Sequence, residues 1–526
     1  MFIAMTKTKL FLILVFVSAF LLRFYRVGDY PPLLWDEASL AYNAYSILKT
    51  GKDEYGQFFP LVFRSFGDFK PGFYVYLALP FVYLFGLNQL AVRLPSVLAG
   101  SFLPVIIFLW MQKYYSRSTF PYIISLITCF NPFNLHFSRG AWESNILVFE
   151  LVLAVYLFSQ SRHFLSSVIF ALTFYTYHSA KLLTPLILLA LFSISQRPKF
   201  CSFYTPLIIL IFPIIFGLVI KSNTNRLAVT SLFSYPRSPE ETMMIINESS
   251  QFNFRFFHHQ IIYFSRNFFD RYFNHFSPRF LIFEGDWQNP RHSAPYVGVL
   301  LFPSILFLII GLLISDYRLP ITKFLFLWLL LSPIPAALTR DSLSAVRALP
   351  LSIPLLYFIS LGLLHFLKKF SSLFVCCLLV TVYILSFFYY SDLYHNHLLK
   401  KSPLDNLYGY RQTIKYLLAN QTKYRSIYLT NFYGQPYIYY LFYGAYPPGD
   451  YQPQANLIAS SVDVGWVKSI DQIHFWAPEF SSIRLQPSTL VIYSHDELIR
   501  QNIDPKILTP LSSINQISTF YAYQNP

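Results

Sequence analysis

Long blocks of apolar residues are the feature that most limits how this 526-residue chain can fold. The blocks run to roughly 17–20 residues, the length that a helix needs to cross a hydrocarbon core of about 30 Å. Hydrophobic residues make up 55% of the chain and charged residues only 12%, well below the charged share of a soluble domain. The sequence therefore predicts a mainly α-helical integral membrane protein with many spans.

The blocks predict about eleven transmembrane helices in a polytopic bundle. We place the spans near residues 10–27, 94–112, 118–136, 146–161, 164–180, 182–196, 203–220, 296–314, 320–338, 348–366 and 371–390. The apolar run 73–87 is short and follows Lys70-Pro71-Gly72, so we interpret it as a helix lying in the membrane interface. No small-residue cleavage pattern follows the first block before Arg23, so we expect an uncleaved first helix rather than a signal peptide.

Charge in the short connectors sets the orientation of these spans. If the N-terminus is inside, every inner connector is short and basic, as the positive-inside rule requires. These connectors carry Lys7, Lys9, Lys113, Arg117, Arg162, Arg197, Lys199, Arg318, Lys368 and Lys369. Topology thus explains much of the net charge of +15, and no nucleic-acid partner is expected.

All the long polar segments then fall on the extracytoplasmic face. The predicted transmembrane domain is 1–390, with outer loops 28–93 and 221–295, and the predicted second domain is 391–526. In this tail "GYRQTIKYLLANQ" has the pattern of an amphipathic helix, whereas "RSIYLTNFY" and "STLVIYS" are typical of strands. We expect a small extracytoplasmic α/β domain there, and place the chain in a bacterial plasma membrane.

Two adjacent carboxylates, Asp36 and Glu37, follow the first span. They begin an amphipathic helix that ends at Lys49-Thr50-Gly51. One interpretation is that Asp36 only caps this helix, where a carboxylate satisfies free N–H groups. The other is that Asp36 is a general base, because a carboxylate can accept a proton from an incoming hydroxyl group.

Basic residues on the outer face favour the second interpretation. Each could be an interfacial anchor when taken alone. Together they describe a cationic rim that could bind a phosphate group held at the bilayer by a lipid tail. The predicted phosphate-binding residues are Lys70, Arg93, Arg139 and Arg347, and further candidates for the substrate cavity are Asp68, Glu143, His178, Asp286, Arg291 and His292.

Several motifs resemble the membrane glycosyltransferases of the C-type fold. "WDEASLAYNAY", "FKPGFYVYL", "RLPSVLAG" and "FSRGAWESN" are similar to the branch that includes the protein O-mannosyltransferases and the lipid A aminoarabinose transferase. "HFSPRFLIFEGDWQNPRHSAP" and "AVRALPLSIPLL" are similar to a bacterial branch of unknown substrate. The resemblance covers approximately residues 10–390 and implies the C-type glycosyltransferase fold.

The resemblance also implies roles for single residues. Asp36 matches the family's catalytic aspartate, with Glu37 as its acidic neighbour, and Lys70 matches the lysine that contacts the lipid-linked phosphate. Phe69 stands where the aminoarabinose branch has a glutamate associated with a metal, and Ser39 stands where that branch has an arginine. Histidines in the 221–295 loop lack local ligand spacing. No metal ligand is therefore assigned, no cofactor is expected, and a divalent metal stays open as an alternative.

The function expected from these features is transfer of a hexose or pentose from a polyprenyl-phosphate-linked donor, with inversion. The acceptor would be a hydroxyl group on a protein, a lipid or a glycan. The alternative is a transporter or flippase for a lipid-linked anion, a class that uses charges buried at the bilayer midplane and repeat-related helices. The predicted spans are nearly free of charge and no internal repeat is evident, which favours the enzyme.

Overall fold

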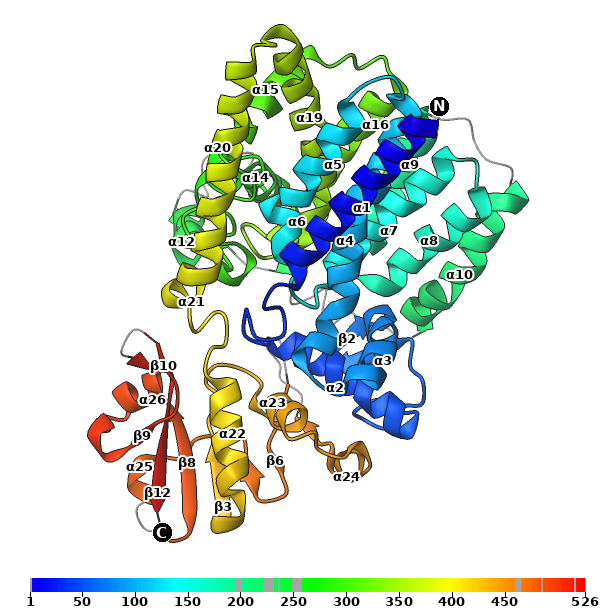
Figure 1. The fold of residues 1–526 in the computed structure, drawn as a ribbon. Helices are drawn as coiled ribbons and strands as arrows, with labels where there is room; N and C mark the ends of the chain where they lie inside the picture. The colour runs from blue at the N-terminus through cyan, green and yellow to red at the C-terminus, as the bar shows by residue number, and fades with distance from the viewer. Residues whose placement is uncertain are drawn as a thin grey trace. The chain divides into compact units, whose positions relative to one another are not determined.

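The computed structural model describes residues 2–194, 200–220, 231–234, 237–247, 258–458, 465–483, 486–514 and 517–525. They form two compact units (Figure 1). Unit 1 comprises 1–19, 100–137 and 147–391, and unit 2 comprises 20–99, 138–146 and 392–526. The boundary after Ser391 lies next to the predicted one, but unit 2 also includes the first outer loop. The predicted domains 1–390 and 391–526 stay a prediction.

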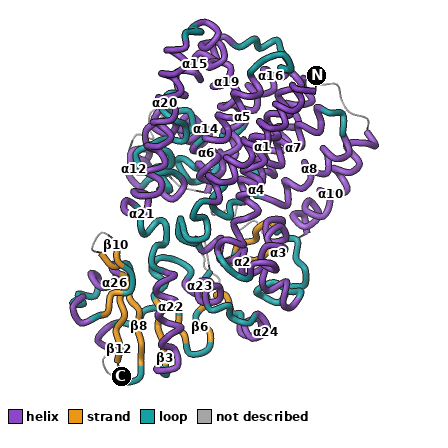
Figure 2. Tube along the Cα trace, viewed as in Figure 1, coloured by secondary structure: helices purple, strands orange, loops and turns teal. Residues whose placement is uncertain are grey.

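Helices make up most of the chain (Figure 2). Those with residues in both units are α1 (Phe2–Phe24), α4 (Gln89–Tyr114), α7 (Glu143–Ser159) and α20 (Leu373–Asp392). Unit 1 also holds α5 (Phe120–Phe130), α6 (Pro132–Phe137), α8 (His163–Thr176), α9 (Ala180–Ile194), α10 (Phe200–Ile220), η1 (Leu232–Ser234), α12 (Pro239–Asn247), α14 (Gln260–Asn274), η2 (Arg279–Phe283), η3 (Pro290–His292), α15 (Ser304–Ile314), α16 (Pro320–Leu331), α17 (Ile334–Ala337), α18 (Ala345–Ala348), η4 (Leu349–Leu351) and α19 (Ser352–Lys369).

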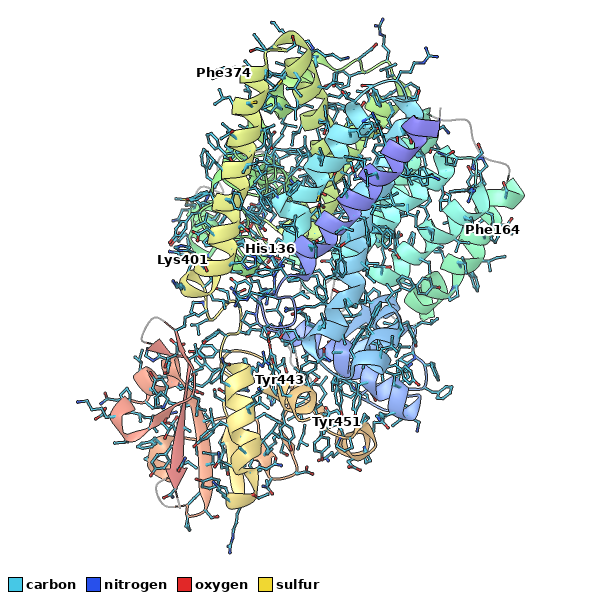
Figure 3. All side chains as sticks on the ribbon, viewed as in Figure 1. His136, Phe164, Phe374, Lys401, Tyr443 and Tyr451 are labelled. Atoms are coloured by element: carbon cyan, nitrogen blue, oxygen red, sulfur yellow. The ribbon has the colours of Figure 1, made fainter. Side chains whose placement is uncertain are left out.

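Each predicted span overlaps one or more helices. Within the described part of the chain, four helical segments are long and apolar enough to cross a membrane: Gln89–Tyr114, Pro320–Ala337, Ala345–Lys369 and Leu373–Lys401. In the last of these only 6% of the most apolar window is buried, and Phe374 is 74% exposed at the outside of α20 (Figure 3). Such an apolar surface needs a lipid or protein cover. The fold supports an integral membrane protein, while the number of spans stays a prediction.

The helices α15 and α19 pack closely in unit 1 because two glycines face each other. A Cβ atom at Gly311 would lie 1.8 Å from the Phe358 carbonyl oxygen, and one at Gly362 would lie 2.0 Å from the Phe307 carbonyl oxygen. Small residues allow this approach between helices in a membrane, where burial from water does not drive packing.

The predicted span 296–314 begins too early. The helix α15 starts at Ser304, because residues before it hydrogen-bond to a neighbouring turn instead. The amide N–H groups of Gly298 and Leu300 donate to the carbonyl oxygens of Ile282 and Leu281, at 2.7 and 2.9 Å. A Cβ atom at Gly298 would lie 2.2 Å from the Ile282 nitrogen, so this approach requires glycine.

The first outer loop forms a helix, a hairpin and a second helix in unit 2. These are α2 (Trp35–Thr50), β1 (Val62–Ser65), β2 (Asp68–Pro71) and α3 (Phe73–Phe85). The predicted amphipathic helix is confirmed, since α2 ends at Gly51, whose φ of 71° lies in the left-handed region that favours glycine. The helix expected over 73–87 is also present as α3, and its place in the interface stays a prediction.

The C-terminal part of unit 2 is a mixed α/β structure, as predicted (Figure 2). Its six-stranded sheet has the order β6-β7-β3-β8-β12-β9, and β3 pairs parallel with both β7 and β8. The helix α22 confirms the helix expected in 409–421, and β3 and β8 confirm the two expected strands.

The elements of this part are η5 (Leu393–His397), α21 (Leu398–Lys401), α22 (Tyr410–Asn420), η6 (Gln421–Lys423), β3 (Ser426–Leu429), α23 (Pro436–Tyr443), α24 (Pro448–Tyr451), η7 (Gln452–Gln454), β4 (Leu457–Ile458), β5 (Trp466–Val467), β6 (Ser469–Ile470), β7 (Ile473–His474), α25 (Phe480–Ile483), β8 (Thr489–Ser494), α26 (His495–Arg500), η8 (Pro505–Ile507), β9 (Thr509–Pro510), β10 (Ser513–Ile514), β11 (Ile517–Ser518) and β12 (Phe520–Asn525). All six residues of β8 are buried, so this strand forms the centre of the sheet.

Candidate active site

Glu37, in the first turn of α2, is buried and saturated with hydrogen bonds. Its Oε1 atom accepts from the Ala141 amide at 2.7 Å and from Arg93 Nε at 2.8 Å. Its Oε2 atom accepts from the Leu34 amide at 3.0 Å and from Arg93 Nη2 at 2.6 Å. A carboxylate has about four lone-pair sites, and all are used here. Glu37 therefore ties the start of α2 to α4 and to the 138–146 segment.

Arg93 is equally occupied. Besides its two bonds to Glu37, its Nη1 atom donates to the carbonyl oxygens of Val27 and Pro31, and its Nη2 atom donates to that of Pro32. The guanidinium group has five N–H donors, and these five bonds use them all. With no exposed surface and no donor left over, Arg93 is not suited to bind a donor phosphate, and we do not retain that prediction for it.

Asp36 does not cap α2. The N-cap position is Leu34, and the carboxylate that returns to its amide is that of Glu37. The side chain of Asp36 is instead 33% exposed and forms an ion pair with Lys70, whose side chain is 16% exposed. The two adjacent acids thus differ in environment, because Glu37 is enclosed by protein and Asp36 is partly exposed.

The hairpin of β1 and β2 holds Lys70 in this place. Lys70 stands opposite Phe63 in the antiparallel register, and its Nζ atom lies 5.7 Å from the centre of the Phe66 ring. Both rings are buried. The turn at Gly72 packs against the hairpin, since a Cβ atom there would lie 2.5 Å from the Phe63 ring. The backbone of Asp68 lies in β2, and its side chain is outside the described part of the chain.

Glu143, at the start of α7, belongs to the same electrostatic environment. Burial raises the pKa of its carboxyl group to about 7, although the Lys70 ammonium group opposes the shift, and the charges of Asp36 and Glu37 add to it. A carboxyl group with such a pKa exchanges protons near neutral pH, which suits a role beside a reacting hydroxyl group.

Arg139 supports the end of α1. Its Nη1 atom donates to the carbonyl oxygens of Leu22 and Arg23, at 2.8 and 3.2 Å, and its guanidinium group lies over the Tyr394 ring. These carbonyls belong to the last turn of α1, where a cation is favoured by the helix dipole. Arg139 is only 1% exposed, so the structure gives it a structural task, and its binding of the donor phosphate stays a prediction.

The other predicted residues lie in unit 1. His292 Nδ1 and Asp286 Oδ2 are 2.9 Å apart, and the Asp286 carboxylate also accepts from the Ala345 amide at 2.8 Å. Burial disfavours the charged form of Asp286, but the hydrogen bond from His292 holds the pKa of that carboxyl below its usual range. Burial lowers the pKa of His292 despite this partner. The pair fixes the 284–293 loop to the segment that leads into α18.

Arg347, His178 and Arg291 have local partners. Arg347 Nη1 donates to Asp341 Oδ2 at 2.5 Å, and the His178 ring lies 3.5 Å from Lys181 Nζ. The carbonyl oxygen of Arg291 is 2.9 Å from His136 Nε2. Their assignment to the substrate site stays a prediction. Of the 221–295 loop, residues 221–230, 235–236 and 248–257 lie outside the described part.

Sequence analysis missed Glu54, which is completely buried after α2. Its Oε1 atom accepts from Asn43 Nδ2 at 3.1 Å and lies 3.5 Å from Ser39 Oγ. Tyr451, on α24, is another member of this buried polar region, and Figure 3 shows it beside the helices of unit 2. The signal that could have identified Glu54 is the polar face of α2, where Ser39 and Asn43 stand one turn apart within a buried helix.

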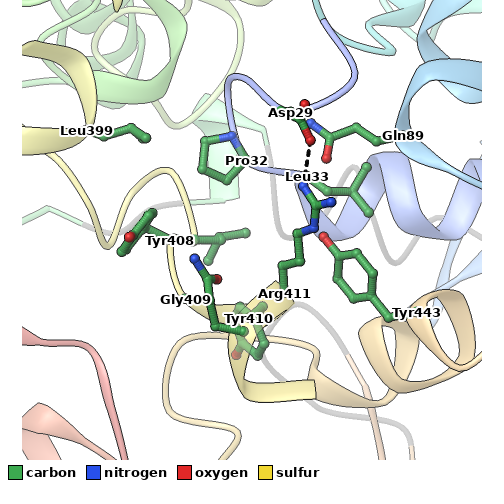
Figure 4. Close-up of a pocket in the computed structure, with 12 residues that line it drawn as sticks. Asp29, Pro32, Leu33, Gln89, Leu399, Tyr408, Gly409, Tyr410, Arg411 and Tyr443 are labelled. Atoms are coloured by element: carbon green, nitrogen blue, oxygen red, sulfur yellow. Dashed lines mark hydrogen bonds and ion pairs between the residues drawn. The ribbon is translucent and has the colours of Figure 1, made fainter. Parts of the chain in front are cut away.

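A small pocket lies beside the start of α22 (Figure 4). It has a volume of about 100 Å³, and Leu33 and Gln89 line it together with the start of α22. Arg411 Nη1 donates to Asp29 Oδ1 at 2.7 Å across it, and the Tyr443 ring borders it.

For metals, no group of three or more potential ligands occurs among the residues that the structure describes.

The chain was compared with known proteins. The model of the dolichyl-phosphate-mannose-protein mannosyltransferase family matches residues 13–176. ArnT from Cupriavidus metallidurans in the apo state has a similar structure, with a TM-score of 0.50 and 12% identity, over 99% of this chain and 98% of that chain. The same protein bound to undecaprenyl phosphate gives a TM-score of 0.50 and 12% identity, over 97% of each chain. The apo oligosaccharyltransferase of Archaeoglobus fulgidus gives a TM-score of 0.43 and 10% identity, over 92% of this chain and 69% of that chain. No curated protein sequence matches.

The family match includes α2, the hairpin with Lys70 and the 138–146 segment, which are the parts that form the site described above. The likeness to ArnT extends along nearly the whole chain and shows a common fold. The resemblance predicted from the sequence is thereby confirmed, and the chain has the fold of the C-type membrane glycosyltransferase superfamily.

Proposed function

We propose that the chain is a membrane glycosyltransferase that moves a sugar from a polyprenyl-phosphate-linked donor to an acceptor hydroxyl group. The observation that carries this proposal is the Asp36–Lys70 pair. It places a proton acceptor directly beside a cation, both accessible, whereas the adjacent Glu37–Arg93 pair is enclosed. The family match and the ArnT fold support the class of reaction. ArnT has been solved with undecaprenyl phosphate, which supports a lipid-linked donor here.

In the proposed reaction the Asp36 carboxylate takes the proton of the acceptor hydroxyl group. The acceptor oxygen attacks the anomeric carbon of the donor sugar, and the bond between that carbon and the phosphate oxygen breaks. The bonding electrons leave with the lipid phosphate, whose charge Lys70 stabilises. Because one displacement occurs, the configuration at the anomeric carbon inverts. The site would face the extracytoplasmic side, as the basic inner connectors predict.

The Glu37–Arg93 pair has a different task in this scheme. It fixes the first turn of α2, so that Asp36 is presented from a rigid helix rather than from a loop. Catalytic groups on rigid elements keep the geometry that proton transfer requires. Glu143 would adjust the charge around the pair, because its carboxyl group exchanges protons near neutral pH.

The test is sugar transfer from a polyprenyl-phosphate sugar by purified wild-type protein and the Asp36→Asn variant. Asparagine has nearly the same shape but cannot take the proton, so transfer should fall by about 10²–10⁴-fold while the protein still inserts and melts normally. Equal transfer by both proteins would refute the role of Asp36. A transporter or flippase would instead move labelled lipid-linked sugar across vesicles without transferring it. Mass spectrometry of cellular glycans, with and without the chain, would identify the sugar and the acceptor.

A further inference from the structure

A buried polar network joins α2 to the hairpin that carries Lys70. Glu54 is its central member, with no exposed surface. The Glu54 carboxyl group accepts from Asn43, and the Glu54 amide donates back to Asn43 Oδ1 at 3.0 Å. Ser39 Oγ lies 3.5 Å from Glu54 Oε1 and 3.2 Å from Ser65 Oγ in β1. The network therefore extends from the loop after α2, through the helix, to the hairpin.

The same two elements hold the proposed reactive pair. Asp36 lies three residues before Ser39 on α2, so both are on one face of the helix. Ser65 lies in β1, two residues after Phe63, which stands opposite Lys70. The hairpin thus contacts α2 at two polar points, the buried Ser39–Ser65 contact and the accessible Asp36–Lys70 ion pair. Both points lie on one hairpin, since Ser65 is in β1 and Lys70 is in β2, which pairs with it.

We propose that Glu54 is a positioning residue of the active site, which fixes the hairpin on α2 through Asn43, Ser39 and Ser65 and thereby holds Lys70 beside Asp36. This inference rests on the proposed roles of Asp36 and Lys70. Glu54 touches neither of them and acts through the hydroxyl and amide groups between.

The neutral form of Glu54 suits this arrangement. Burial raises the pKa of its carboxyl group to about 8, although the Asn43 amide opposes the shift. Above this pH the buried Glu54 carboxyl group is negatively charged. The titratable and charged groups around it are Asp53 and Tyr55 of its own loop, Tyr42 of α2, Arg64 of β1, Tyr437 of α23 and Tyr451 of α24. The guanidinium carbon of Arg64 lies over the Tyr55 ring, 5.2 Å from its centre, and the remaining neighbours are acids or hydroxyl groups. Ionisation should therefore loosen the hairpin.

Two variants separate the neutral form from the charged one. Glu54→Gln keeps the shape and the acceptor oxygen and cannot ionise, whereas Glu54→Ala removes the contact to Asn43 and Ser39. We expect the donor KM of the wild type to increase when the pH exceeds about 8, and the donor KM of Glu54→Gln to stay constant over the same range. At pH 7 the donor KM of Glu54→Ala should be about tenfold higher than that of the wild type. The control is Lys52→Ala, an exposed change in the same loop. A wild-type donor KM in Glu54→Ala, or an unchanged alkaline rise in Glu54→Gln, would overturn the proposal.

A second measurement does not depend on activity. Hydrogen exchange of residues 62–71 reports the hairpin directly and should be faster in Glu54→Ala than in the wild type at pH 7. If Glu54→Ala does not fold, Ser39→Ala combined with Ser65→Ala keeps the Glu54 carboxyl group but removes the hydroxyl contacts that join it to the hairpin, and should have the same effect on exchange. Unchanged exchange in these variants would refute the positioning role. Faster exchange without any sugar transfer by the wild type would refute the proposed function alone.

Discussion

Glu37 and Arg93 share two hydrogen bonds, and backbone amides and carbonyls take up the rest of their hydrogen-bonding positions, so neither side chain has one left for a ligand. The side chains are 4% and 0% exposed. A motif of two adjacent acids therefore serves two purposes, since Glu37 builds the helix start that presents Asp36.

Removing either member of the Glu37–Arg93 pair should destabilise the protein. Glu37→Ala leaves a buried guanidinium group without its carboxylate, which typically costs about 3–5 kcal/mol. We expect a strong loss of melting temperature in detergent, and Glu37→Gln should lose less because it keeps the shape and one acceptor. Asp36→Asn provides the matched control. The Asp36 side chain is partly exposed, so this variant should melt like the wild type. Equal melting of Glu37→Ala and the wild type would show that the buried pair does not hold α2.

Lys70→Ala should weaken use of the lipid donor. It removes the proposed ammonium contact to phosphate, and such a charge-assisted contact contributes about 1.5–3 kcal/mol. The donor KM should rise roughly ten- to a hundredfold, measured by transfer at varied donor concentration. Lys70→Arg should recover part of the loss, and Lys52→Ala should leave the donor KM at its wild-type value. A donor KM that does not respond to Lys70→Ala would make this residue an interfacial anchor.

The sequence predicted the fold well where periodicity and length carry the information. The helix over α2, its stop at Gly51 and the strands β3 and β8 are set by local pattern and by turn chemistry. The start of α15 was predicted wrongly, because the backbone of 298–300 pairs with the turn at Arg279–Phe283, a contact that hydropathy cannot register.

The candidate site was predicted less completely. Asp36 and Lys70 were identified by motif, and the structure brings them together although 33 residues separate them in the sequence. Arg93 was assigned to the phosphate because it lies on the outer face, but only tertiary structure reveals that its five donors are already used. Glu54 belongs to no motif, and its importance follows from its complete burial.

The predicted topology can be tested with single cysteines in a cysteine-free background. The basic inner connectors predict that Gln524 lies outside and Ser161 inside, and both side chains are exposed in the structure. Gln524→Cys should react with an impermeant maleimide in intact cells, and Ser161→Cys only after permeabilisation. Ser250, in the outer loop, would be a further site but lies outside the described part of the chain. Labelling of Gln524→Cys only after permeabilisation would reverse the orientation and place the active site inside.

Stability should depend on pH through Glu143. Its carboxyl group has a pKa of about 7 in the folded protein, above the ordinary value of 4.5. A raised pKa means that the folded state binds the proton more tightly than the unfolded state does. The resulting stabilisation is fully present below about pH 4.5 and is lost as the pH rises through 7. Glu143→Gln cannot ionise, so its melting temperature should equal that of the wild type near pH 5 and exceed it at pH 8. Glu54→Gln should show the same sign, with the loss in the wild type continuing up to about pH 8, and the double variant should combine both effects. If Glu143→Gln and the wild type differ by the same amount at pH 5 and pH 8, the Glu143 carboxyl group does not change its charge in this range, and its place beside Lys70 serves packing alone.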